Sequence, residues 1–584
     1  MRFHQLLGGL VPLVGLAAAF PTCNNGCNRG CWGDGFDVLS DWESKWPITG
    51  KTNIYELEIT EVDEWVGPDG GVKHGAMLIN GGFPGPVIRG NWGDRFDVIV
   101  TNKLKYNGTS MHWHGLHLWN NNINDGVSGI TECPIPPGHS KKYSFIATQY
   151  GSSWYHSHIS SQYANGIVGA IQIDGPSTYP YDDDLGAFPI NDWYYDSVEH
   201  IVTRMMDPNN PFRSGSPGSP PQSDNILFNG TNINPSGPGG EYAKVRLTSG
   251  KRHRLRLINP SADNTFTISV VGHTMTVIEA DFVPVQPYDT TEVYLGVGQR
   301  YDVVINADQP AGAYWLNATL SSNGLCGSSK NPYPAAIVTY EGFEESLPTD
   351  PGVPPVDTYC ADDVSIRPLV PISAPQTEFN PRPEDTLSVS LDVNTNISKV
   401  FWEVNGVPID VSWEKPTLQY VLENDLSFPL EANVIQLPDE TVWTFWVIQN
   451  VSPIPHPMHL HGHDFLVLGR SEFLADPTSA PGPTFFDPAV DTAKLTFENP
   501  TRRDTTMLPG FGWLVIAFRA GENPGAWSFH CHIPWHMSQG LSVKFLERPD
   551  IMASRMDLPS IQENCNVWRE YAPTNPFQKF DSGL

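Results

Sequence analysis

Short runs in which apolar and polar side chains alternate recur along the chain. Examples lie at residues 96–100, 267–271 and 541–545. Alternation with a period of two places successive side chains on opposite faces of a β-strand. Long stretches of helical periodicity are rare. The pattern therefore predicts an all-β protein made of sandwiches or barrels.

Turn-forming residues suggest where the chain divides. Its 53 prolines and 52 glycines are spread throughout, but joints rich in them lie at residues 174–180 and 348–355. A length of 584 residues suggests three or four domains of ordinary size. We predict three domains, at residues 21–178, 179–366 and 367–584.

The N-terminus has the pattern of a secretory signal peptide. Arg2 precedes an apolar run at residues 6–20 that contains three consecutive alanines, so we expect residues 1–20 to be removed and the protein to be extracellular. The alternative is a buried N-terminal helix. No longer apolar run follows, so we expect no membrane span. Glycosylation acceptors occur at Asn107, Asn229, Asn317, Asn396 and Asn450, the last weakened by the nearby Pro453.

Charge narrows the range of partners. The formal net charge is −29, from 35 basic and 64 acidic residues, and no basic stripe is present. This balance argues against a nucleic-acid partner. Hydrophobic residues make up 40% of the chain, enough for large cores. A soluble monomer is the expected state, with an oligomer left open.

The candidate chemistry lies in four His-x-His pairs, one of which encloses a cysteine. On a strand, His530 and His532 would face one side and Cys531 the other, so one segment could reach two metal sites. His536 follows at a distance that lets it share a metal with Cys531. Cysteine and imidazole with a weak axial ligand form a blue copper site. The other pairs are His112 with His114, His156 with His158, and His459 with His461, the last preceded by His456.

A single pair would more often be a surface or core histidine pair than a metal site. Four pairs, one of which encloses a cysteine, argue against ordinary surface or core histidines and favour a metal site. All the pairs lie in the first and last predicted domains, so a shared metal centre requires these two domains to meet. The middle domain would be a spacer or shape a substrate surface. We interpret seven other histidines as structural: His74, His117, His139, His200, His253, His273 and His463.

The four motifs in this order resemble those of the multicopper oxidases, enzymes of three cupredoxin domains, across nearly the whole mature chain. Residues 457–465, 502–507 and 581–584 are similar to those of ascomycete laccases. The resemblance implies three cupredoxin-like Greek-key β-barrel or sandwich domains and four copper ions, one of type 1, one of type 2 and two of type 3. It also implies one-electron oxidation of small phenolic and aromatic donors, coupled to reduction of O₂ to water. Lignin fragments, pigment precursors and defence phenols all fit as substrates.

The resemblance also implies a role for each candidate ligand. Donors would be oxidised near His536, which lies toward the surface in the family. The type 1 copper would be bound by His456, Cys531 and His536, the type 2 copper by His112 and His459, and the type 3 pair by His114, His156, His158, His461, His530 and His532.

The axial position of the blue site departs from a methionine-ligated pattern. Blue-copper spacing places this ligand five residues after His536, at Leu541, whose side chain cannot coordinate. Met537 directly follows His536 and does not fit the spacing. A missing axial donor leaves Cu(II) less stabilised, so we predict a more oxidising copper.

Two acidic residues match functional positions of the family. Asp125, in Asn124-Asp125-Gly126, matches the acid near the type 2 copper and is a candidate proton relay. Its alternative is an ordinary Asp-Gly turn. Asp263 matches an acid that contacts phenolic substrates and could accept a proton from them. Its alternative is a solvated loop acid.

Cysteines and the C-terminus complete the comparison with the family. The resemblance implies the disulfides Cys23–Cys31, Cys133–Cys565 and Cys326–Cys360, which leave Cys27 over. Related laccases are trimmed after a sequence equal to residues 581–584, and the new tail lies in the channel toward the trinuclear cluster. Here that sequence already ends the chain, so we expect a plug without trimming. An ordinary frayed tail is the alternative.

Two rival functions remain at this point. Another multicopper oxidase, such as a ferroxidase or an ascorbate oxidase, would carry the same copper motifs. A non-catalytic copper-binding or storage protein is a rival of a different class. Storage does not require a cysteine placed between two cluster histidines, so the complete set of ligands favours an oxidase.

Overall fold

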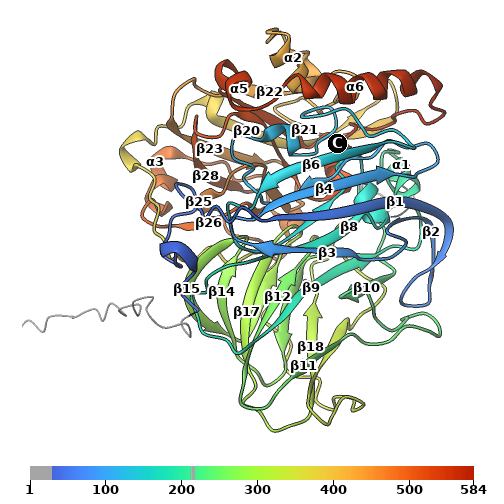
Figure 1. The fold of residues 1–584 in the computed structure, drawn as a ribbon, viewed down its shortest axis with the longest axis vertical. Helices are drawn as coiled ribbons and strands as arrows, with labels where there is room; N and C mark the ends of the chain where they lie inside the picture. Colours follow the sequence, from blue (N-terminus) through green and yellow to red (C-terminus); the bar gives the residue numbers. More distant parts are fainter. Residues whose placement is uncertain (1–28, 211, 213–217) are drawn as a thin grey trace, which may run out of the picture.

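The computed structural model describes residues 29–210, 212 and 218–584, and it confirms the all-β prediction (Figure 1). Three domains follow one another along the chain, each built from two β-sheets packed face to face. The predicted signal peptide and residue 23 of the predicted Cys23–Cys31 bond lie outside the described residues. The three predicted strands fall in β4, β13 and β30, with bounds given below.

The first domain pairs two four-stranded sheets, ordered β2-β1-β4-β6 and β3-β8-β7-β5. Its buried side chains form one core that includes Trp92, Phe96 and Trp113. Its strands are β1 (Thr52–Val66), β2 (Val72–Ile79), β3 (Gly85–Asn91), β4 (Arg95–Asn102), β5 (His112–Trp113), β6 (Ser140–Ile146), β7 (Gly151–His156) and β8 (Val168–Asp174).

The second domain pairs a six-stranded sheet, β10-β9-β12-β17-β14-β15, with a five-stranded sheet, β11-β19-β18-β13-β16. Its strands are β9 (Asp183–Trp193), β10 (Asn225–Phe228), β11 (Lys244–Leu247), β12 (Arg252–Ile258), β13 (Phe266–Val270), β14 (Met275–Ala280), β15 (Val283–Thr290), β16 (Glu292–Leu295), β17 (Arg300–Asn306), β18 (Ala313–Thr319) and β19 (Ala335–Tyr340).

The third domain repeats this plan with the sheets β21-β20-β23-β28-β25-β26 and β22-β30-β29-β24-β27. Its strands are β20 (Thr386–Asn394), β21 (Lys399–Val404), β22 (Val434–Gln436), β23 (Val442–Asn450), β24 (His456–Leu460), β25 (Phe465–Arg470), β26 (Thr501–Arg503), β27 (Thr505–Leu508), β28 (Trp513–Ala520), β29 (Gly525–Cys531) and β30 (Ser542–Glu547).

Every one of these sheets contains one parallel pair of neighbouring strands, and its other pairs are antiparallel. The parallel pairs are β1 with β4, β3 with β8, β9 with β12, β11 with β19, β20 with β23 and β22 with β30. A parallel pair cannot be joined by a hairpin, so the chain crosses between sheets in each domain. This mixture fits the Greek-key arrangement of cupredoxin-like domains.

Helices are short and lie between or after the strands. The α-helices are α1 (Val198–Met205), α2 (Thr417–Leu422), α3 (Pro488–Asp491), α4 (Pro534–Ser538), α5 (Pro549–Arg555) and α6 (Ser560–Tyr571). Single 3₁₀ turns are η1 (Gly33–Gly35), η2 (Asn122–Asn124), η3 (Gln162–Asn165), η4 (Gln376–Glu378), η5 (Pro383–Asp385), η6 (Leu430–Ala432), η7 (Pro477–Ser479), η8 (Thr492–Lys494) and η9 (Ala572–Thr574).

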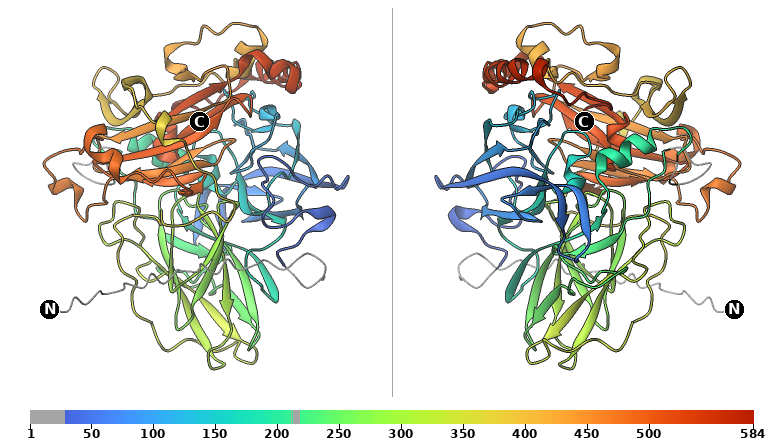
Figure 2. Two further views of the ribbon diagram at one scale, coloured as in Figure 1. Left: turned by 90° about the vertical axis from the view of Figure 1, so that its left-hand side faces the viewer. Right: turned by 90° about the vertical axis from the view of Figure 1, so that its right-hand side faces the viewer.

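The first and third domains lie side by side, and the second lies below both, as the side views show (Figure 2). A disulfide between Cys133 and Cys565 ties a loop of the first domain to helix α6 of the third. A second disulfide joins Cys326 to Cys360. These two predicted pairings are confirmed, and the first of them braces the interface between the terminal domains.

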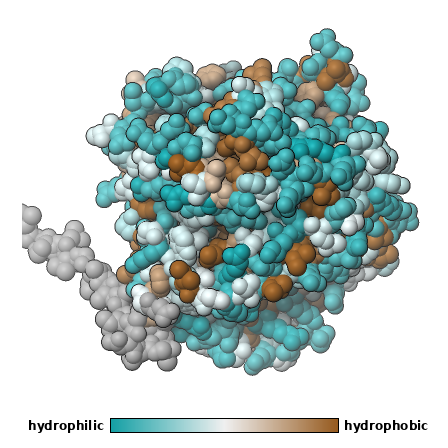
Figure 3. All heavy atoms as spheres, turned by 45° about the horizontal axis from the view of Figure 1, so that its top comes forward, coloured by the Kyte–Doolittle hydropathy of each residue, from teal (hydrophilic) through white to brown (hydrophobic). Residues whose placement is uncertain are grey.

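One face of the molecule shows a mostly hydrophilic surface (Figure 3). On the face drawn in Figure 3, brown hydrophobic residues are dispersed among hydrophilic ones. Within the described ranges, none of the helices is long and apolar enough to span a membrane. Asn229 and Asn396 are exposed, whereas Asn450 is buried and its amide donates to the carbonyls of Ile454 and Pro509. Asn450 is therefore unsuitable as a glycan acceptor in the folded protein.

Candidate metal centres

Strand pairing in the first and third domains sets the histidine motifs opposite one another. His112 on β5 pairs with His156 on β7. In the third domain, β24 and β29 are antiparallel neighbours, with His459 opposite His530. Each pairing brings together imidazoles that are far apart in sequence. The interface between the two domains then brings the two sets of histidines together.

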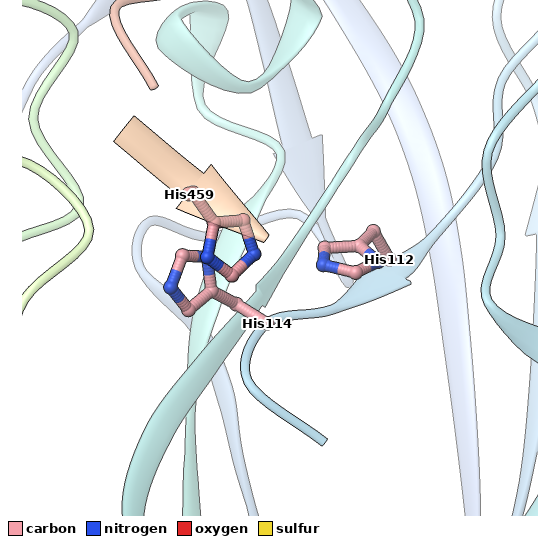
Figure 4. Close-up of side chains that lie close together, drawn as sticks. All are labelled: His112, His114 and His459. Atoms are coloured by element: carbon pink, nitrogen blue, oxygen red, sulfur yellow. The ribbon is translucent and has the colours of Figure 1, made fainter. Parts of the chain in front are cut away.

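Eight histidines form a buried cluster across this interface. Figure 4 shows three of its members, with His112 and His114 from the first domain facing His459 from strand β24. The rings of His114 and His459 stack, with centroids 3.9 Å apart. The nitrogens lie close enough to hold a metal in three groups: His112, His114 and His459; His114, His156 and His532; and His158, His461 and His530.

Main-chain oxygens orient four of these rings, those of His112, His156, His459 and His530. The Nδ1 atom of His112 lies 2.8 Å from the main-chain oxygen of Asp125, and that of His459 lies 2.9 Å from the main-chain oxygen of Asp504. Each Nδ1 can donate there only if it carries the ring proton. The Nε2 atoms of His112 and His459 have no hydrogen-bond partner within the described residues. Their lone pairs are therefore available to a metal.

Carboxylates orient two further rings. The Nε2 atom of His114 lies 3.3 Å from Asp504. The other nitrogen of the same ring, Nδ1, faces the cluster and lies 3.0 Å from Nε2 of His532. The Nδ1 atom of His461 lies 3.0 Å from Asp125, which leaves its Nε2 atom 3.0 Å from Nε2 of His530. Pairs of ring nitrogens thus face each other at distances that a bridging or shared cation would satisfy.

The electrostatics of the cluster also favour a cation. Burial and the neighbouring imidazoles hold the pKa of each ring well below its usual range, so the rings are uncharged and keep a free lone pair; this applies to His114, His156, His158, His461, His530 and His532. Neutral imidazole is the form that binds copper or zinc. The residues therefore fit a group of metal ions.

A separate group consists of His456, Cys531 and His536. The Cys531 Sγ atom lies 3.5 Å from Nδ1 of His456 and 3.5 Å from Nδ1 of His536, and these two nitrogens are 3.1 Å apart. Burial lowers the pKa of His456 to about 3 and holds that of His536 well below its usual range. Burial also raises the pKa of the Cys531 thiol. One sulfur and two neutral imidazoles are the donor set of a blue copper site.

Leu541 occupies the position next to this group that the sequence spacing indicates. Its side chain is buried in the same core cluster as Cys531, and the Cys531 N–H donates to its main-chain oxygen at 3.2 Å. Met537 packs in a different cluster, together with Trp413 and Leu584. The contacts fit the interpretation of Met537 as a residue outside the donor set.

His536 is buried in this structure. Its side chain is only 1% exposed. The indole of Trp402 lies 4.5 Å from the imidazole, measured between ring centroids, and also contacts His456. Trp402 is itself fully buried. One indole thus packs against the imidazoles of both His456 and His536, a contact that the His-x-His pattern does not contain.

Asp125 combines the two interpretations that its sequence left open. It ends η2, and Gly126 follows with a φ of 76°, where an added Cβ would meet the carbonyl oxygen of Met111 at 1.7 Å. The tight turn is therefore real, and it directs the buried carboxylate at His461, 3.0 Å away. Its other oxygen lies 3.2 Å from Nδ1 of His112. The turn and the metal cluster use the same residue.

Asp263 is not the solvated loop acid that we considered, because it is only 7% exposed. Its loop is held by Asp192, whose carboxylate accepts hydrogen bonds from the N–H groups of Ala262, Asp263 and Asn264 at 2.7 to 2.9 Å. Asp192 was not identified from the sequence. Its role depends on a contact between segments about seventy residues apart, which strand patterns do not reveal.

Asp504 and Arg300 are further residues that the motif analysis did not single out. Asp504 lies within the segment 502–507 that supports the resemblance, but no role was inferred for it. Burial favours its protonated form, yet Arg300 and His114 hold the pKa of this carboxyl well below its usual range. It therefore carries a negative charge beside the cluster.

Histidines that were interpreted as structural have other partners. His117 faces Asp464 at 3.2 Å, His463 faces Glu547 at 3.0 Å, and His273 contacts the Tyr340 hydroxyl at 2.9 Å. Throughout the described part of the chain, none of the seven joins a group of three possible metal ligands.

The C-terminal tail is packed, which contradicts the frayed-tail alternative. Leu584 is fully buried. The Gly583 carbonyl accepts a hydrogen bond from the Trp413 indole at 2.9 Å, and the Ser582 hydroxyl donates to the Met537 carbonyl at 3.0 Å. Asp581 accepts a hydrogen bond from Ser160 of the first domain. The tail thus contacts both domains that form the histidine cluster.

Family models for the multicopper oxidases match the chain at residues 61–178, 186–343 and 402–550. Over 572 residues the chain is 52% identical to laccase-1 of Melanocarpus albomyces, covering 97% of this chain and 90% of that protein. It is 50% identical to laccase-2 of Podospora anserina, with 96% and 90% covered.

Solved structures agree with the sequence comparison. The laccase from Botrytis aclada is 35% identical, with a TM-score of 0.86 and coverage of 96% of this chain and 100% of that one. Fet3p, a multicopper oxidase that functions in iron import, is 27% identical, with a TM-score of 0.78 and coverage of 89% and 95%.

Proposed function

Because the chain belongs to the multicopper oxidase family, we propose that it is a laccase, which oxidises phenolic and related aromatic donors and reduces O₂ to water. When bound, four copper ions would supply the redox chemistry: one accepts single electrons from the donor, and the four together store the four electrons that reduce O₂ to water. The observation that carries the proposal is the segment 530–532. Cys531 belongs to one ligand group, whereas His530 and His532 belong to two others.

Each group of candidate ligands can then be assigned to a copper ion. We assign His456, Cys531 and His536 to the type 1 copper, and His112 and His459 to the type 2 copper. The remaining six histidines form two sets of three for the type 3 pair: His114, His156 and His532, and His158, His461 and His530.

The chain itself supplies the path between the two centres. The Cys531 side chain and the imidazoles of His530 and His532 are attached to consecutive residues, so a continuous covalent path joins the groups. Strand β29 ends at Cys531, and its neighbour β24 carries His456 into the group of Cys531 and His459 into the histidine cluster. The pairing of β24 with β29 therefore fixes the separation of the two centres.

Asp125 is proposed to supply protons for oxygen reduction. Its carboxylate is fully buried and faces the Nδ1 atom of His461. From this position it orients the ring and can pass a proton toward the cluster. The nearby carbonyl of the same residue orients His112.

The donor is proposed to bind near His536, with Asp263 accepting the phenolic proton as the electron leaves. The support for this role is the burial of Asp263 and its rigid loop, which Asp192 holds through main-chain hydrogen bonds. The packed Trp402 indole beside His536 forms a wall of the type 1 site.

Secretion, a monomeric state and domain limits at residues 178 and 366 remain proposals. The apolar N-terminal run supports export, and the exposed acceptors Asn229 and Asn396 support glycosylation. The pairs of sheets lie at residues 52–174, 183–340 and 386–547, inside the proposed domain limits. The buried tail supports a plug beside the cluster.

A panel of donors tests the proposed function on the copper-loaded protein. We expect a blue absorption band and O₂ consumption with phenols, and much lower kcat/KM with Fe(II) and ascorbate. Preference for Fe(II) would instead identify a ferroxidase. The likeness to Fet3p, a multicopper oxidase that functions in iron import, is the reason for including Fe(II) in the panel. Copper binding without O₂ consumption on any donor would identify a storage protein.

A further inference from the structure

A buried arginine of the middle domain reaches the histidine cluster through one carboxylate. Arg300 is the first residue of β17, and its side chain is 1% exposed. Its Nη1 atom donates to Oδ1 of Asp504 and its Nη2 atom to Oδ2, both at 2.7 Å. This two-pronged pair is the geometry that gives an arginine–carboxylate contact both strength and direction.

Asp504 in turn touches two histidines from different domains. Its Oδ1 atom lies 3.3 Å from Nε2 of His114, in the first domain. Its main-chain oxygen accepts from Nδ1 of His459, in the third domain, at 2.9 Å. The Thr505 hydroxyl donates to the same Oδ1 atom at 2.9 Å and lies 3.1 Å from Nδ1 of His459. One residue thus orients two adjacent, stacked rings.

Arg300 is itself held in place from several sides. Its Nε atom donates to the Ser152 carbonyl of the first domain at 3.3 Å, and Nη1 also donates to the Gly298 carbonyl at 3.2 Å. Asp281 accepts from the Arg300 N–H at 2.7 Å and from Nε of Arg503 at 2.7 Å. Arg300 therefore lies in a series of alternating buried charges that links the second and third domains, and it also bonds a carbonyl of the first.

The first domain leaves space for this contact. Gly115 follows His114 directly and has a φ of 77°, so a side chain there would be strained. A Cβ atom at this position would lie 2.4 Å from Nη2 of Arg300 and 2.4 Å from Oδ2 of Asp504. Only glycine allows the ion pair to approach the backbone beside the ligand histidine.

We infer that Arg300 is a positioning residue of the oxygen-reducing site, acting through Asp504 on His114 and His459. This inference rests on the proposed assignment of these histidines to the trinuclear cluster. The middle domain, which we first considered a spacer, is then a structural part of that cluster. Arg300 contacts no reacting atom, and its effect is to hold two ligand rings at one angle and one separation.

The pairing requires an arginine rather than any cation. A lysine ammonium is a single point of charge and cannot bond both oxygens of Asp504 in one plane. In an Arg300→Lys variant the charge balance is kept, but the carboxylate is free to rotate. Its hydrogen bond to His114 then loses a fixed direction.

The test compares Arg300→Lys with the matched control Arg254→Lys. Arg254 is a second buried arginine of the middle domain, bonded to Asp302 at 2.8 Å and to Glu279 at 3.2 Å. Among the described residues, its guanidinium is hydrogen-bonded to these acids and not to a ligand histidine. Both variants lose one buried guanidinium that is bonded to carboxylates, so a purely structural loss should be similar in the two.

The readouts are copper content, the electron paramagnetic resonance spectrum and the blue absorption band, besides kcat and KM for O₂. For Arg300→Lys we expect a changed type 2 copper hyperfine splitting and type 2 copper binding weakened roughly 10- to 100-fold, as for other outer partners of metal ligands. The blue band should be unchanged. Arg254→Lys should lose thermal stability while its type 2 spectrum stays that of the wild type.

A double variant keeps the inference falsifiable if Arg300→Lys folds poorly. If Arg300 acts through Asp504, then Arg300→Lys should add little to the spectral change of Asp504→Asn. A wild-type type 2 spectrum and copper content in Arg300→Lys would overturn the inference, as would additive changes in the double variant. Failure of the proposed ligand assignment is a different result, because the wild-type protein itself would then lack the type 2 signal; failure of the laccase proposal alone would show in the donor panel and leave that signal in place.

Discussion

The Cys531 N–H donates to the main-chain oxygen of Leu541 at 3.2 Å, and both side chains are buried in one core cluster. The sequence spacing assigns this aliphatic residue to the weak axial position of a blue copper site, and its burial beside Cys531 is compatible with that assignment. Replacing it with a donor changes the stability of Cu(II) relative to Cu(I).

Leu541→Met should lower the reduction potential of the type 1 copper. The thioether would stabilise Cu(II), and the swap changes side-chain volume little. Redox titration of the blue band measures the effect. Met537→Leu is the control, because Met537 packs in another cluster and should leave the potential alone. An unchanged potential in Leu541→Met would refute the axial argument.

Asp125→Asn should slow oxygen reduction by roughly 10- to 100-fold while donors still reduce the blue copper normally. The amide cannot cycle a proton and holds His461 less firmly. Anaerobic stopped-flow reduction and steady-state O₂ uptake separate the two halves of the reaction. Asp464→Asn is a matched control, since that buried acid faces His117, which is not a proposed ligand. Equal slowing in both variants would count against a proton relay.

Asp263→Asn should reduce kcat/KM for phenols more than for a donor that has no acidic hydroxyl. Only the phenol loses a proton together with its electron, so only the phenol needs the carboxylate as acceptor. A pH series with both donors measures the difference. Losses of the same size for both donors would leave Asp263 as a packing residue.

Removal of residues 581–584 should change the kinetics of O₂ uptake without removing the blue band. The deletion opens a space bordered by Trp413 and by the carbonyl of Met537, which follows the ligand His536. Leu584→Ala is the milder companion, and loss of a buried leucine side chain costs about 2–5 kcal/mol. Kinetics identical to the wild type in the deletion variant would rule out the plug.

Docking of the tail should weaken as pH rises. Burial raises the pKa of Asp581 from 3.8 to about 6, so the packed tail favours the protonated acid. The contribution to docking is complete below the unfolded value and is lost as pH rises through about 6, by roughly 3 kcal/mol in total. Release of Leu584 by carboxypeptidase should therefore be faster at about pH 7 than at about pH 4.

The control for that experiment is Asp581→Asn, which cannot ionise. For this variant, the ratio of the Leu584 release rates at the two pH values reflects only the pH dependence of the carboxypeptidase. If the wild-type ratio equals that of the variant, ionisation of Asp581 does not govern docking.

The sequence predicted those features that depend on local periodicity. Alternating runs identified strands such as β4, and His-x-His spacing identified the candidate ligands. Grouping of the ligands could not be read from spacing, because it depends on the register of β24 against β29 and on the interface of two domains. The resemblance to a known family was needed to divide them among copper types.

Contacts between remote residues were the part that the sequence did not predict. Arg300 and Asp504 are 204 positions apart and meet only after three domains have packed. The indole beside His536 likewise comes from a remote element, because Trp402 lies in strand β21 and His536 in helix α4. Whether such groups are buried and which residues they contact depends on the complete fold. No short stretch of sequence therefore indicates these contacts.

The Cys133–Cys565 disulfide closes 432 positions of the chain, and every proposed copper ligand except His112 and His114 lies between its two cysteines. A ribosome must therefore finish almost the entire polypeptide before either the crosslink or the trinuclear site can exist. Uptake of that copper is consequently a late step in biogenesis. An exporting cell would have to deliver the metal to a finished chain rather than to one still being made.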